Sequence, residues 1–121
     1  MHMVKRKKTS GSPENLQIAL KKATTEMMVL HLLLEKPMYT YEMMNAITER
    51  SGGDITFNTL YLSIYRLEEN GYIREHEKVM SEDNRTRIYF AVTDAGTEYL
   101  DALILEYKRY TAALARVLEL G

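Results

Sequence analysis

Apolar side chains recur at alternating steps of four and three residues over residues 16–34, which is the spacing of one face of an α-helix. Pro13 suits the first turn of such a helix, whereas Pro37 cannot continue it. A second helix is expected over residues 40–50, because Ser51 and two adjacent glycines follow and end the pattern. The first fifty residues therefore predict two helices joined by a short turn.

A third helix is expected over residues 57–70, with Thr56 as its N-cap and Gly71 as its stop. One face of this helix keeps aromatic and hydrogen-bonding side chains, among them Asn58 and Tyr65, and so differs from an ordinary solvated face. Such a face is suited to contact with another molecule. The apolar stripe expected to pack on the core is Leu60, Ile64 and Leu67.

Two segments with the period-two alternation of β-strands follow, at residues 72–79 and 87–93. The segment between them, residues 80–86, is almost entirely polar. This arrangement predicts a β-hairpin with a flexible loop at its tip.

Residues 94–120 form one long helical pattern, with Thr93 as its N-cap. The apolar stripe of this helix is wide enough to need cover from a second subunit, so we expect a homodimer. In the alternative interpretation the helix folds back on the first helix of the same chain, and the two arrangements are compatible. The predicted dimerisation positions are Leu100, Leu103, Tyr107, Tyr110, Leu114 and Val117, with Ile104 and Leu118 beside them.

Length and composition indicate one globular domain, since the chain has 121 residues, of which 45% are hydrophobic and 27% charged. The longest apolar run, residues 27–34, is far shorter than a membrane-spanning helix, and no signal peptide is visible. The absence of cysteine excludes disulfides and thiolate metal sites. A cytoplasmic location is therefore expected, without a membrane partner.

The formal net charge of −1 is unevenly distributed. Residues 5–8 are all basic, and the rest of the chain carries 12 basic and 17 acidic residues, a net charge of −5. Any contact with nucleic acid must therefore be local, through the basic segment Lys5 to Lys8 and a few placed arginines. The alternative interpretation of residues 1–13 is a solvated leader without a binding role.

Three helices followed by a hairpin is the element order of the winged helix-turn-helix, whose third helix enters the major groove of DNA. Four segments occur in this order: EKPMYTYE at 35–42, TLY at 59–61, YRLEENGYI at 65–73 and RIYFAVTDAG at 87–96. With these segments the chain resembles the PadR family of bacterial transcriptional regulators. Thr40 and Leu62 depart from the pattern, because the family usually has glycine and often proline at these positions.

The resemblance implies a mainly α fold with a β-hairpin wing, a winged helix-turn-helix plus a long C-terminal dimerisation helix. It divides the chain into a flexible basic arm (1–13), a DNA-binding domain (14–93) and a dimerisation helix (94–121). It also implies a sequence-specific DNA-binding regulator, a homodimeric repressor that a small aromatic or planar hydrophobic ligand releases from its double-stranded operator.

The residues themselves suggest how DNA would be bound. Tyrosines at the start of the second helix can donate hydroxyls to phosphates beside its N-terminus. Polar residues at the start of the third helix have the length to contact base edges, and arginines on that helix and on the wing suit phosphates or the minor groove. The predicted DNA-binding residues are Tyr39, Tyr41, Asn58, Thr59, Tyr61, Arg66, Arg85 and Arg87. For some, a structural role is the alternative: Tyr61 in the core, Arg66 paired with Glu69 or Asn70, Arg85 solubilising a loop.

An effector site is expected where tyrosines replace leucine at adjacent core positions of the last helix. Two phenols from each subunit would line a flat slot at the dimer axis. The alternative interpretation is that these tyrosines are ordinary interface aromatics. The predicted ligand-binding residues are Leu20, Met27, Ile104 and Tyr107.

No enzyme or cofactor motif accompanies these features. His2, His31 and His76 have no partners at metal-ligand spacing, and there is no glycine-rich phosphate loop or nucleophile elbow. We therefore expect neither a catalytic site nor a metal or cofactor. A dimeric protein-interaction module on a winged-helix scaffold, without operator binding, is the alternative function.

Overall fold

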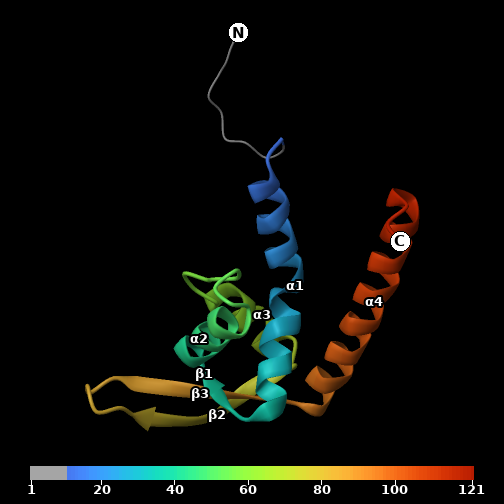
Figure 1. Cartoon of the computed structure of the whole chain (residues 1–121). Helices are drawn as coiled ribbons and strands as arrows, with labels where there is room; N and C mark the ends of the chain where they lie inside the picture. Colours follow the sequence, from blue (N-terminus) through green and yellow to red (C-terminus); the bar gives the residue numbers. More distant parts are fainter. Residues whose placement is uncertain (1–10) are drawn as a thin grey trace.

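The computed structural model describes residues 11–121. Helix α1 (Pro13–Glu35) is followed by the short strand β1 (Met38–Tyr39), helix α2 (Thr40–Arg50) and helix α3 (Tyr61–Glu69). Strands β2 (Ile73–Met80) and β3 (Thr86–Val92) form the hairpin, and helix α4 (Asp94–Leu118) ends the chain. Figure 1 shows the hairpin extending away from the helices as a wing. The predicted fold class, a winged helix-turn-helix followed by a long helix, is confirmed.

Local sequence signals account for most element ends. Ser12 caps α1 by accepting the Asn15 amide at 3.3 Å, and Pro13 occupies the first turn. Gly53 adopts a φ of +87° as its amide donates to the carbonyl of Thr48, which closes the end of α2. Thr93 caps α4 by accepting the Gly96 amide at 3.0 Å. These signals lie within a few residues of each end, so the sequence could predict them.

The sheet has the order β1-β3-β2, with both pairs antiparallel. Strand β1 pairs Met38 with Phe90 and Tyr39 with Tyr89, so the start of α2 is fixed to the wing. The sequence pattern did not predict this two-residue strand. The β2-β3 ladder runs from Ile73 opposite Val92 to Met80 opposite Thr86, with an irregular register between Glu75 and Glu77.

The prediction for the third helix was wrong at its N-terminus. Residues 57–60 lie in a loop, and α3 begins at Tyr61. Thr56 does not cap a helix, because no helix begins beside it. Its carbonyl accepts the Lys21 ammonium at 2.7 Å, and the same ammonium lies 5.0 Å from the ring centre of Phe57. These contacts with α1 hold the loop and override its helical pattern. The predicted apolar stripe is confirmed, since Leu60, Ile64 and Leu67 are all buried.

The core lies between α1, α2, α3, the root of the wing and the first turns of α4. Tyr72 at the wing root stacks on Tyr99 of α4 at 4.1 Å, and the Tyr99 hydroxyl donates to Glu26 of α1 at 2.8 Å. Burial and this bond to a carboxylate raise the pKa of Tyr99 to about 12. At the C-terminal end of α1, Glu35 accepts two hydrogen bonds from Arg50 of α2, at 2.7 and 2.8 Å.

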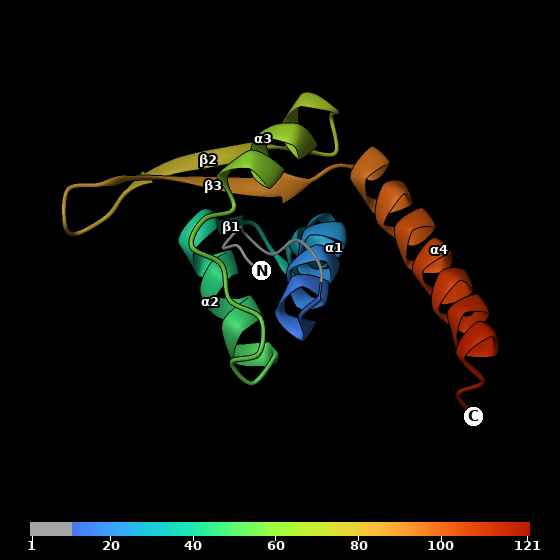
Figure 2. The same cartoon turned by 90° about the horizontal axis from the view of Figure 1, so that it is seen from above.

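Helix α4 packs on α1 of its own chain only in its first half, and the two helices then diverge (Figures 1 and 2). Leu100 is only 1% exposed, so it belongs to the core of its own chain and not to a dimer seam. Leu103 and Ile104 pack against the same core. The alternative interpretation, in which α4 folds back on α1, therefore holds for this half. The exposed predicted dimerisation positions are Tyr107, Tyr110, Leu114 and Val117.

Candidate nucleic-acid interface

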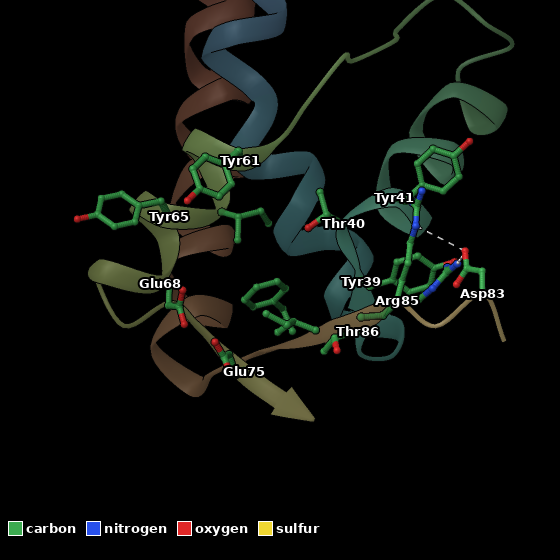
Figure 3. Close-up of a pocket in the computed structure, with 14 residues that line it drawn as sticks. Tyr39, Thr40, Tyr41, Tyr61, Tyr65, Glu68, Glu75, Asp83, Arg85 and Thr86 are labelled. Atoms are coloured by element: carbon green, nitrogen blue, oxygen red, sulfur yellow. Dashed lines mark ion pairs between the residues drawn. The ribbon is translucent and has the colours of Figure 1, made fainter. Parts of the chain in front are cut away.

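A groove of about 820 Å³ lies between the start of α2, helix α3 and the wing (Figure 3). Its position follows from the sheet order, because β1 fixes the start of α2 beside β3 and α3 packs above the wing root. The groove brings together five of the eight predicted DNA-binding residues. These are Tyr39, Tyr41, Tyr61, Arg85 and Arg87.

One end of the groove, at the wing tip, is basic but is partly neutralised by its own chain. Asp83 lies 3.7 Å from Nε of Arg85 and 3.8 Å from Nη2 of Arg87. A hydrogen bond from the Ser81 hydroxyl lowers the pKa of the Asp83 carboxyl, and the backbone amide of Arg85 and both arginine charges act in the same direction. Asp83 therefore forms long, solvent-exposed ion pairs with both arginines, which a phosphate would have to replace.

Arg87 is further fixed by the aromatic side chains beneath it. Its guanidinium lies 4.6 Å from the ring centre of Tyr39, and Tyr39 contacts Tyr89 edge to face at 5.3 Å. The Nε atom of Arg87 is buried and has no hydrogen-bond partner among the described residues. Arg87 is therefore preorganised and retains unused donor capacity.

The remaining predicted DNA-binding residues do not line this groove. Asn58 and Thr59 are exposed in the loop that precedes α3, and the Thr59 hydroxyl accepts the Tyr61 amide at 3.1 Å. Arg66 is exposed on α3, and its carbonyl accepts the side-chain amide of Asn70 at 2.9 Å. The predicted contribution of Lys5 to Lys8 lies outside the described residues.

Several residues that line the groove were not among the predicted site residues. Tyr65 stood out in the sequence on the exposed face of the third helix, but Glu68, Glu75 and Asp83 gave no comparable signal. Their positions depend on how α3 crosses the wing and on the turn at the tip, where Asn84 has a φ of +64°. The other lining residues are Thr40, Ile64, Thr86, Ile88 and Phe90.

The four predicted ligand-binding residues lie apart from this groove. Met27 and Ile104 pack against the core, whereas Leu20 and Tyr107 are about half exposed. A slot lined by them would require a second copy of the chain. That slot therefore stays a prediction.

Two other kinds of feature are absent from residues 11–121. None of the helices described there has the length and apolar character needed to cross a membrane. The same residues contain no group of three histidine, aspartate or glutamate side chains arranged to hold a metal ion.

Known proteins are similar to this chain in sequence or in both sequence and fold. An uncharacterized protein from Lysinibacillus sphaericus is 33% identical over 81 residues, which is 65% of this chain and 73% of that protein. A PadR family regulator structure from Eggerthella lenta matches with a TM-score of 0.76 and 26% identity, covering 89% of this chain and 93% of that one. A regulator from Clostridium thermocellum matches with a TM-score of 0.72 and 25% identity, covering 81% and 96%.

The sequence profile of the family described as "Transcriptional regulator PadR-like family" matches residues 29–102. This span runs from the second half of α1 to the start of α4 and includes all four segments on which the resemblance was based. Fold, sequence and motif order agree, so the chain belongs to the PadR-like family of transcriptional regulators.

Proposed function

We propose that this regulator is a cytoplasmic homodimeric repressor that binds an inverted-repeat DNA operator. The observation that carries the proposal is the groove, where four tyrosines and two arginines from β1, α2, α3 and the wing converge. In a winged helix, the third helix enters the major groove and the wing contacts the flanking backbone. The convergence of these elements supports DNA contact by this face.

The exposed side chains divide into two kinds of DNA contact. Tyr41 in the first turn of α2 is 61% exposed, and with Arg85 and Arg87 it suits phosphate oxygens. Asn58 and Thr59 precede α3, and Tyr61 begins it at 76% exposed, so these three suit base edges. Arg66 suits a phosphate one turn further along.

Dimerisation is supported by the second half of α4. Tyr107, Tyr110, Leu114 and Val117 are all exposed, and an apolar stripe of this length is costly in water. A second α4 would cover it. In such a dimer the two recognition helices are expected about 34 Å apart, or a small multiple of that distance, to match successive turns of DNA.

The DNA proposal is tested by fluorescence anisotropy with the promoter DNA upstream of the chain's own gene and with a scrambled duplex of the same length. Asn58→Ala should change sequence preference by about 1–3 kcal/mol at one base pair. Arg66→Ala should weaken binding to both duplexes and reduce the salt dependence. Equal effects of both variants on both duplexes would contradict base readout by this region.

We also propose that a planar aromatic effector binds at the dimer axis and releases the DNA. Tyr107 is half exposed on the unpaired part of α4, and Leu20 of α1 is exposed as well. Such a ligand would change the α4 crossing and hence the spacing of the recognition helices. Calorimetry with phenolic acids and flavins tests this: Tyr107→Ala should lose ligand binding and keep operator binding.

One observation favours the alternative function, a dimeric protein-interaction module. Asp83 lies within ion-pair distance of both wing arginines, which reduces their attraction for phosphate. A protein that dimerises but binds promoter and scrambled DNA equally weakly at low salt would support this alternative and refute the repressor proposal.

A further inference from the structure

The groove has a second end, away from the wing tip, whose charge is opposite to that required by DNA. Glu68 of α3 and Glu75 of β2 line this end together with Tyr61 and Tyr65 (Figure 3). Both carboxylates belong to exposed residues, and the ion pair recorded here, from Glu75 to Lys78, is long at 4.0 Å. Two carboxylates repel phosphates, so the DNA backbone is a poor occupant of this end.

The floor between the two ends is apolar. Ile64 is 5% and Phe90 7% exposed, and Ile88 beside them is half-buried. The groove volume of about 820 Å³ lies within the range of small-molecule sites, which combine apolar walls with a few polar groups. An aromatic ring would therefore gain contact area on this floor.

The other end of the groove shows that its tyrosine faces hold cations, since the Arg87 guanidinium lies 4.6 Å from the ring centre of Tyr39. Tyr61 and Tyr65 line the acidic end, and among the described residues no cation is recorded over their rings. The Tyr65 hydroxyl donates to Glu69 at 3.3 Å, which leaves the faces of both rings without a recorded cation from the described part of the chain. Two phenol ring faces beside two carboxylates form a site complementary to an organic cation.

We propose that this end of the groove binds a small arylalkylammonium compound. The ring lies on Ile64 and Phe90 between the tyrosines, and the ammonium contacts Glu68 and Glu75. This site is separate from the slot proposed around Tyr107. Because Tyr61 serves both partners, bound ligand excludes DNA directly, a consequence that rests on the proposed function.

Binding is tested without DNA by NMR titration of the full chain with phenethylammonium, for which a Kd of about 1 mM is expected. Two matched probes separate the contributions: 3-phenylpropionate replaces the ammonium with a carboxylate, and n-butylammonium lacks the ring. Both should bind at least fivefold more weakly. Equal binding of the three probes, or no binding of phenethylammonium at 10-fold its expected Kd, about 10 mM, would overturn the proposal.

Variants locate the site. The double variant Glu68→Gln with Glu75→Gln should weaken phenethylammonium at least fivefold, while Glu77→Gln, an exposed change on the same strand, should not. Unchanged binding in the double variant overturns the proposal, and circular dichroism checks that each variant is folded. In the unmodified protein, DNA binding without probe binding refutes this site alone, whereas probe binding without DNA binding refutes the repressor alone.

Discussion

Gly96 lies where α4 passes closest to the wing root, and Gly96→Ala should destabilise the protein strongly. A Cβ atom at this position would lie 2.0 Å from the carbonyl oxygen of Tyr72 and 2.8 Å from Cγ2 of Val92. Both are far inside ordinary van der Waals contact. The Tyr72 carbonyl also accepts the Thr93 amide at 3.0 Å, so moving it away weakens the bond that precedes α4.

The expected magnitude follows from opposing effects. Alanine is favoured over glycine in a helix by about 1 kcal/mol, which alone would make the variant more stable. Overpacking costs about 1–3 kcal/mol and a weakened hydrogen bond about 1 kcal/mol. The close approach to backbone atoms places the cost at the upper end, so we expect a net loss of about 2–3 kcal/mol. The sign of the change therefore decides between packing and propensity.

Urea denaturation at one fixed protein concentration measures this loss. With a slope of about 2 kcal/mol per molar urea, the midpoint should fall by about 1–1.5 M. Ala95→Leu is the matched control, because Ala95 is exposed in the same turn and its replacement should change stability by less than about 0.5 kcal/mol. A Gly96→Ala midpoint equal to or above that of the unmodified protein would refute the reasoning.

Three further predictions concern charge and assembly. Asp83→Asn should remove the ion pairs of Asp83 with Arg85 and Arg87 and so tighten DNA binding about two- to fivefold, with a steeper salt dependence in anisotropy titrations. Weaker DNA binding would contradict the idea that Asp83 competes with phosphate for these arginines. The pKa of Tyr99 is about 12 in the folded protein and 10.0 in the unfolded chain, so the folded state holds the hydroxyl proton more tightly. The resulting stabilisation is fully present below pH 10 and is lost as the pH rises towards about 12. Tyr99→Phe should therefore show a shallower loss of stability between these pH values in chemical denaturation, and parallel curves would refute the assignment. Leu114→Asp should give monomers in sedimentation, whereas Lys108→Asp, at an exposed position outside the stripe, should leave dimers; a monomeric unmodified protein would refute dimerisation.

Short-range signals made most of the fold predictable. The caps of α1 and α4 and the glycines after α2 fix element ends through contacts a few residues away. The start of α3 was not predictable in this way. Lys21, far away in sequence, binds the Thr56 carbonyl and holds residues 57–60 out of the helix. A contact between distant segments leaves no periodic trace in the sequence.

The candidate interface was predictable only in part for the same reason. Tyrosines and arginines near expected helix starts and at the wing tip are visible as residue types, and five of them converge on the groove. The ion pairs of Asp83 with the wing arginines depend on the turn geometry at Asn84, which the sequence pattern does not specify. Leu100 was assigned to a dimer seam because its heptad position does not reveal whether its own chain covers it.

The wing is fixed to the core only at its root, so a small rotation there moves its tip a long way. Of the eight residues in β2, only Ile73 at the root is buried, and a strand of this length extends roughly 25 Å. Turning it by about 5° about its root displaces the tip by about 2 Å, comparable with the range over which a hydrogen bond forms or fails. Because α4 passes so close to the Tyr72 carbonyl that a single methyl group does not fit, a tilt of α4 would move the wing root, and the length of the wing would magnify that movement at Arg85.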